Sequence, residues 1–169
     1  MTTETRTATP SRGGGLLARV VGTRAATLEV DIALVAVRIA LAWIFTYYGG
    51  AKLFGWFNGA GIDGTATFMS DTAHLNPGTF FAVLGGLIEL GAAVALVLGL
   101  GSRLFALALV GDQVMAMITV TWSTGIHSES HTGYELNVAL IALALVIVLV
   151  GAGRYSVDAL VERRLATKE

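Results

Sequence analysis

The chain has 169 residues, enough for one domain, and only 14% of them are charged whereas 54% are hydrophobic. Soluble domains carry about 25% charged residues, so this composition indicates that much of the surface faces something other than water. A net charge of −1 gives no reason to expect nucleic acid as a partner, and the absence of cysteine excludes disulfides, iron–sulfur clusters, thiolate metal sites and thiol catalysis by this chain itself.

The first 30 residues are expected to form a cytoplasmic polar tail. They contain four arginines and a run of three glycines, and no apolar core typical of a secretory signal precedes the first long hydrophobic run. The remaining chain divides into a membrane domain over residues 31–152 and a C-terminal segment over residues 153–169.

Four hydrophobic runs follow the tail, each close to the roughly 20 apolar residues that a membrane-spanning helix needs. They cover residues 32–51, 79–100, 104–122 and 134–150. The connection between the first two, rich in Gly, Asp, Asn and Thr, is predicted to be a long loop. A soluble four-helix bundle would need a polar stripe on each helix, and residues 138–150 offer none. The sequence therefore predicts an all-α polytopic membrane protein with four transmembrane helices in a left-handed bundle.

Charge outside these runs predicts the orientation. Gly151 and Gly153 are expected to end the fourth helix, and residues 156–165 to form a short amphipathic helix capped by Ser156 at the membrane interface. Of the 11 basic residues, nine lie on one side of a four-span arrangement and Lys52 alone on the other. Since cytoplasmic segments are enriched in Lys and Arg, both termini are predicted to be cytoplasmic.

Three ionisable residues fall inside the hydrophobic runs, where charges are expensive. At about 1.5 Å per residue, Glu89, Asp112 and Arg38 lie roughly 15, 13 and 10 Å from the inner end, so the three are predicted to meet near mid-membrane. We expect Arg38 and Glu89 to face each other. Two interpretations stay open: a buried ion-pair network that locks helix packing, or groups that bind protons or a ligand.

A second polar group is predicted at the outer end. Tyr48 and Lys52 close the first run, while His127 and Glu135 bracket the start of the fourth, so these four side chains are predicted to border one pocket open to the extracytoplasmic face. The alternative is that Lys52 and His127 only contact lipid headgroups.

Metal binding is not expected in this outer region. Two histidines in the segment HSESH are four residues apart and a third lies in the first connection, but a metal needs three or four converging ligands and the segment has no evident fixed geometry. These candidates are His74, His127 and His131. No histidine lies mid-span to hold a haem between two helices.

Several short motifs follow one another over residues 30–160. They are Arg38, Gly49-Gly50-Ala51-Lys52, Gly85-Gly86-Leu87-Ile88-Glu89, Gly99-Leu100-Gly101-Ser102-Arg103, His127 with Gly133-Tyr134-Glu135-Leu136, and Gly151-Ala152-Gly153-Arg154-Tyr155-Ser156-Val157-Asp158. In this order they resemble the DoxX family of bacterial membrane proteins, in which proline usually stands where this chain has Ala152. Asp112 matches no motif of the family.

The resemblance implies a four-helix protein of the bacterial inner membrane that is linked to redox chemistry. Family members are described as subunits of a thiosulfate:quinone oxidoreductase, and one as the membrane part of a complex with a superoxide dismutase and a sulfurtransferase. The implied partners are therefore the bilayer, other membrane or peripheral redox proteins and further copies of this chain. Without cysteine, this chain is expected to be part of an oxidoreductase rather than a complete enzyme.

Three functions stay open at this point. The first is a redox-linked subunit that binds a quinone among the helices, with Tyr48, Lys52 and His127 as hydrogen-bond donors and Glu89 or Glu135 handling protons. The second is a non-catalytic accessory or anchoring subunit. The third is a small-solute or proton-coupled transporter.

Overall fold

The computed structural model describes residues 27–127 and 133–166, which are mostly helical and contain no strand. This confirms the predicted all-α class. The elements are α2 (Thr27–Phe54), η1 (Trp56–Asn58), α3 (Gly61–Asp71), α4 (Gly78–Leu98), α5 (Ser102–Ala116), η2 (Met117–Thr121), η3 (Trp122–Thr124), α6 (Glu135–Val150) and α7 (Val157–Ala166).

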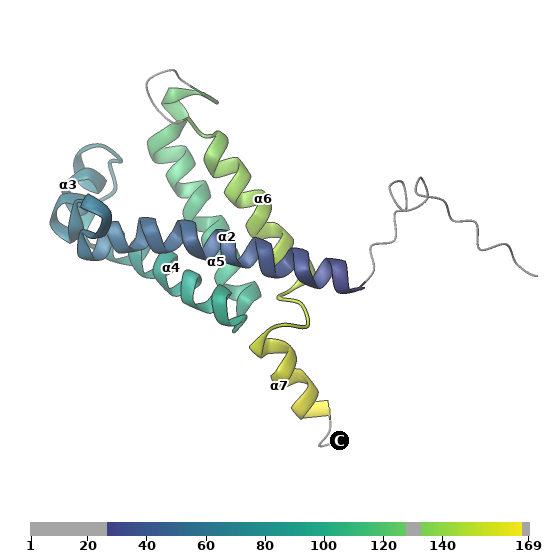
Figure 1. Ribbon diagram of the computed structural model, residues 1–169. Coiled ribbons are helices and arrows are strands. Elements are labelled where there is room, and N and C mark those ends of the chain that lie inside the picture. Colours follow the sequence, from purple (N-terminus) through teal and green to yellow (C-terminus); the bar gives the residue numbers. More distant parts are fainter. Residues whose placement is uncertain (1–26, 128–132, 167–169) are drawn as a thin grey trace, which may run out of the picture.

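The helices are arranged as two crossing pairs (Figure 1). Helices α2 and α4 lie along each other, α5 and α6 form the second pair, α3 covers one end of the α2–α4 pair, and α7 projects from the opposite side of the molecule. Helices α2 and α4 are antiparallel, because Arg38 contacts Leu96 near the end of α4, whereas a Cβ added to Gly49 would lie only 2.8 Å from the nitrogen of Leu90.

Glycine allows this close approach of the two helices. Neither Gly49 nor Gly86 has room for a side chain: a Cβ on Gly49 would also lie 3.1 Å from the Gly86 carbonyl oxygen, and one on Gly86 would lie 2.6 Å from the side chain of Leu53. Small residues at such crossings let backbones pack closely where no hydrophobic effect drives association.

The interior is apolar and so is much of the outer surface. Leu41, Phe45, Leu96, Leu109 and Ile147 are fully buried. Facing outward are equally large apolar side chains with exposed fractions of 80% for Trp43, 70% for Leu104 and 75% for Leu149. An outer surface of this kind is stable against lipid rather than water.

Two helices in the described part of the chain are long and apolar enough to cross a membrane, namely α4 and the continuous helical segment Ser102–Thr124. Helix α6 is equally apolar but has 16 residues. Helix α2 has 28 residues, about 40 Å at 1.5 Å per residue, and carries four charged residues. Crossing by all four segments stays a prediction.

The connection over residues 52–78 is not the long loop that was predicted. It contains η1 and α3, and α3 packs on α4. Its Gly, Thr and Ala residues gave no sign of this helix, since its stabilisation comes from packing on α4, where Ala66 and Ser70 lie against Gly78, rather than from intrinsic propensity. At the other end of the chain, the predicted cap is confirmed: the Ala159 amide donates to Ser156 Oγ at 3.2 Å.

Candidate functional site

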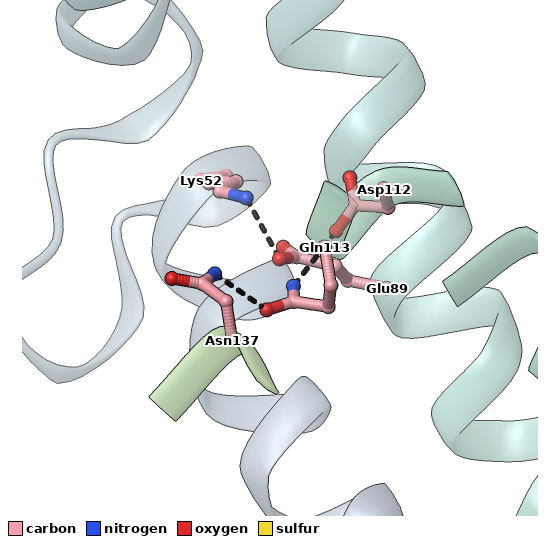
Figure 2. Close-up of polar contacts among 5 residues, drawn as sticks. All are labelled: Lys52, Glu89, Asp112, Gln113 and Asn137. Atoms are coloured by element: carbon pink, nitrogen blue, oxygen red, sulfur yellow. Dashed lines mark hydrogen bonds and ion pairs between the residues drawn. The ribbon is translucent and has the colours of Figure 1, made fainter. Parts of the chain in front are cut away.

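A partly buried ion pair links the end of α2 to the middle of α4. Lys52 Nζ, from the last turn of α2, lies 2.7 Å from Glu89 Oε1 in the middle of α4 (Figure 2). The Glu89 side chain is only 2% exposed, and that of Lys52 is 24% exposed. Helical side chains lean toward the N-terminus of their own helix. Because the helices are antiparallel, Lys52 leans inward and Glu89 leans toward it.

A chain of hydrogen bonds runs from η2 through α6 to α5 beside this pair. Thr121 Oγ1 donates to Asn137 Oδ1 at 2.9 Å, Asn137 Nδ2 donates to Gln113 Oε1 at 2.9 Å, and Gln113 Nε2 donates to Asp112 Oδ2 at 3.0 Å. Figure 2 shows Lys52, Glu89 and the last three of these side chains converging from four helices. Every donor in the chain points toward Asp112, so this carboxyl group fixes the orientation of both amides.

A cavity of about 170 Å³ lies between the ion pair and the amides. Its walls come from α2, α4, α5, η2, α6 and the residues before α6, and they combine a phenol, a carboxyl group, two amides and aliphatic side chains. The lining residues are Tyr48, Glu89, Gln113, Thr121, Gly133, Leu136, Asn137 and Leu140. Within the described residues, Glu89 Oε2 is buried and has no hydrogen-bond partner. A buried polar atom without a partner is costly, so this oxygen is suited to accept a hydrogen bond from a ligand in the cavity.

Asp112 faces a different space. An apolar groove of about 220 Å³ runs between α4 and α5, and Asp112 is the one charged residue among those that line it. The centre therefore has two carboxyl groups, one at the polar cavity and one at the groove, and one lysine.

Arg38 does not take part in this centre, and the predicted contact between Arg38 and Glu89 is wrong. The guanidinium donates to four main-chain carbonyl oxygens at the inner end: Leu96 at 2.7 Å, Val97 at 2.9 Å, Ala152 at 3.0 Å and Tyr155 at 2.8 Å. The reason is again the lean of helical side chains toward the N-terminus, which carries Arg38 away from Glu89. Two of these oxygens, those of Leu96 and Val97, lie in the last turn of α4, where carbonyls lack the i+4 partners of the helix interior.

Asp158 completes the inner end. Its carboxylate accepts hydrogen bonds from the amides of Gly101, at 2.8 Å, and Ser102, at 3.1 Å, which begin α5. Nearby, Asp31 accepts a hydrogen bond from the amide of Arg154 at 2.9 Å. The C-terminal motif therefore links the start of α5 to the inner end of α2 through these hydrogen bonds.

The four residues predicted for one outer pocket fall into separate places. Tyr48 lines the cavity, and Lys52 is bound to Glu89 behind it. His127 Nδ1 lies 3.1 Å from Glu135 Oε1, with side chains 72% and 37% exposed, and neither of these two residues lines the cavity.

The histidines predicted as low-priority metal ligands do not gather within the described ranges, where no group of three His, Asp or Glu residues could hold a metal ion. His74 follows α3 with a left-handed backbone, φ 57°. His131 lies outside the described residues. Sequence reasoning missed Gln113 and Asn137, although amides inside apolar runs are a signal for polar contacts between membrane helices.

Comparison with known proteins identifies the family of this chain. A protein-family model, DoxX, matches residues 33–122, more than half of the 169-residue chain. The match includes α4, all of α5 and most of α2, with both members of the Lys52–Glu89 pair. No curated protein and no solved structure matches the chain. The family, together with the apolar helices, makes this a membrane protein, and the chain belongs to the DoxX family.

Proposed function

We propose that this chain is an integral membrane subunit of a redox system and that it binds a quinone head group in the cavity beside Glu89. The observation that carries the proposal is the unpaired Oε2 of Glu89, which is buried in a residue that lines the cavity. Around it lie neutral hydrogen-bonding groups and aliphatic walls, the combination typical of sites that hold a small polar ring in an apolar setting.

Quinone chemistry fits these groups. The carbonyl oxygens of a quinone accept hydrogen bonds, which the Tyr48 hydroxyl and the Asn137 amide are placed to donate. A quinol instead donates through its hydroxyl groups, and Glu89 Oε2 is the matching acceptor. The same oxygen would take one of the two protons that a quinol releases when it loses two electrons to a partner, and the second proton would leave to bulk water.

The electrons must come from or go to another protein. This chain has no cysteine to hold an iron–sulfur cluster. The proposed role is therefore to bind the quinone within the membrane, while a partner subunit carries out electron transfer. This assignment makes the chain a subunit rather than a complete enzyme.

The proposed topology has four spans, formed by α2, α4, the segment Ser102–Thr124 and α6, with both termini in the bacterial cytoplasm. It is supported by the distribution of Lys and Arg. Since the chain has no cysteine, single cysteines can be introduced. Those at Asp63 and His127 should react with a membrane-impermeant maleimide in intact cells, and one at Arg164 should not. The reverse labelling pattern would refute the orientation.

Quinone binding is tested by purifying the protein in mild detergent, extracting it with organic solvent and titrating the quinone-free protein with decylubiquinol, the reduced form whose hydroxyl groups can donate to Glu89 Oε2, under anaerobic conditions. A hydrogen bond to a charged group contributes roughly 1.5–3 kcal/mol, so Glu89→Gln should weaken binding about 10- to 100-fold. Tyr48→Phe should weaken it less. Glu162→Gln, an exposed acid on α7, is the matched control and should bind as the parent protein does.

Two results would contradict the proposal. One is decylubiquinol binding that is equal in the parent protein and Glu89→Gln. The other is a parent protein that binds no quinone but co-purifies with a stoichiometric protein partner, which would favour the accessory-subunit function instead.

A further inference from the structure

The groove between α4 and α5 has chemistry distinct from that of the quinone cavity. Its walls are almost entirely hydrocarbon, thioether and aromatic, from residues such as Phe81, Leu84 and Met115, and Asp112 is the one carboxyl group among them. Asp112 does not line the cavity beside Glu89. The groove is therefore a separate space with one acidic group in an apolar wall.

The charge of Asp112 is not matched inside the described bundle. Lys52 is close enough to act on it electrostatically, but the ammonium group is bonded to Glu89 Oε1 at 2.7 Å. The hydrogen bond that Asp112 does receive comes from the neutral amide of Gln113. A carboxylate in an apolar wall needs a proton or a cation as its counter-charge.

We propose that this groove binds a small lipophilic cation, a substituted ammonium group carried on apolar substituents, with Asp112 as its counter-ion. Charge complementarity selects a cation over a neutral ligand, and the hydrocarbon walls select apolar substituents over a hydrated metal ion. The groove does not share its acidic residue with the quinone cavity, so the proposed cation site is a second binding site in addition to the function proposed above.

The dimensions and wall chemistry agree with such a ligand. At about 220 Å³, the groove is smaller than the roughly 300–1,000 Å³ typical of sites for drug-sized molecules, so the ligand must be small. Phe81 is the aromatic residue among those that line the groove, and an aromatic ring can attract a cation through its face. The space beside the carboxyl group is kept open by Gly85, on which an added Cβ would lie 3.5 Å from Asp112 Oδ1.

Benzyltrimethylammonium and its neutral carbon isostere, neopentylbenzene, provide a matched pair of probes. They have the same shape and differ by one charge. Binding of radiolabelled benzyltrimethylammonium to the purified full chain in lipid nanodiscs is measured by scintillation proximity. We expect saturable binding that unlabelled benzyltrimethylammonium displaces and that neopentylbenzene displaces at least 10-fold less effectively.

Three variants complete the test. Asp112→Asn should weaken binding at least 10-fold, Asp112→Glu should retain most of it, and Asp63→Asn, an exposed acid on α3, should leave it unchanged. Size-exclusion chromatography shows whether each variant is folded. Equal displacement by the neutral isostere in the parent protein would overturn the proposal without recourse to any variant, as would unchanged binding in folded Asp112→Asn. Loss of benzyltrimethylammonium binding in each of the single variants Glu89→Gln and Asp112→Asn would also overturn the proposal, because the cavity and the groove would then act as one site.

Discussion

Replacing Arg38 by methionine removes the inner clamp while keeping most of the volume of the side-chain stem. The guanidinium makes four hydrogen bonds to main-chain carbonyls and the residue is only 3% exposed. At roughly 1.5–3 kcal/mol for each hydrogen bond from a charged donor, the sum is about 6–12 kcal/mol. That sum is an upper bound, because the four bonds share one group and are not independent. The variant also relieves the desolvation of the guanidinium.

We therefore expect Arg38→Met to lower the free energy of unfolding by about 3–5 kcal/mol, at the high end for single substitutions. Unfolding by SDS from dodecyl maltoside micelles, followed by tryptophan fluorescence, measures this change. Arg38→Lys is the control: it keeps the charge, but one nitrogen cannot span the end of α4 and the segment after α6 together, so about half of the loss should remain. A loss below about 1 kcal/mol in Arg38→Met would refute the assignment of this residue as a clamp.

Three further changes in stability can be measured by the same unfolding assay. Lys52→Met strands the Glu89 carboxylate and should cost about 3 kcal/mol, most of which the double variant with Glu89→Gln should recover; additive losses would show that the pair does not interact. Asp158→Ala removes the acceptor for two amides at the start of α5 and should lower the free energy of unfolding by about 1–2 kcal/mol. An unchanged free energy of unfolding would show that these two hydrogen bonds do not stabilise the start of α5. Gly49→Ala places a Cβ 2.8 Å from the facing backbone of α4 and should cost about 1–3 kcal/mol. Gly111→Ala, where no atom of the described residues lies within 4 Å of the added Cβ, should leave the free energy of unfolding unchanged, and equal effects of the two variants would contradict the close approach of α2 and α4.

The positions of the main helices could be predicted because long hydrophobic runs are easily recognised in a sequence. The four predicted runs fall on α2, α4, the segment Ser102–Thr124 and α6. Helix α3 could not be predicted in the same way, because its sequence has neither a long apolar run nor a charged N-cap, and its stability depends on packing against α4.

The partners of the buried charges were harder to predict than their locations. Distances along the helix axis placed Arg38 and Glu89 at similar depths, but side chains on antiparallel helices lean in opposite directions along that axis. Lys52 was expected at the outer surface, yet this lean brings it to Glu89. The acceptors of Arg38 are main-chain oxygens, which carry no residue-specific signal, so no sequence pattern could have identified them.

The clamp around Arg38 also relates folding to the order of synthesis. Helix α2 is made early, and its guanidinium meets the Leu96 and Val97 carbonyls as soon as α4 follows. The acceptors of Nη1 lie 114 and 117 residues further along the chain than Arg38. In an α2–α4 hairpin, therefore, the Arg38 guanidinium has only two of its four acceptors while the rest of the protein is being translated. The inner end closes when the segment after α6 arrives, so a product interrupted before that segment retains an open end that a quality-control protease can recognise.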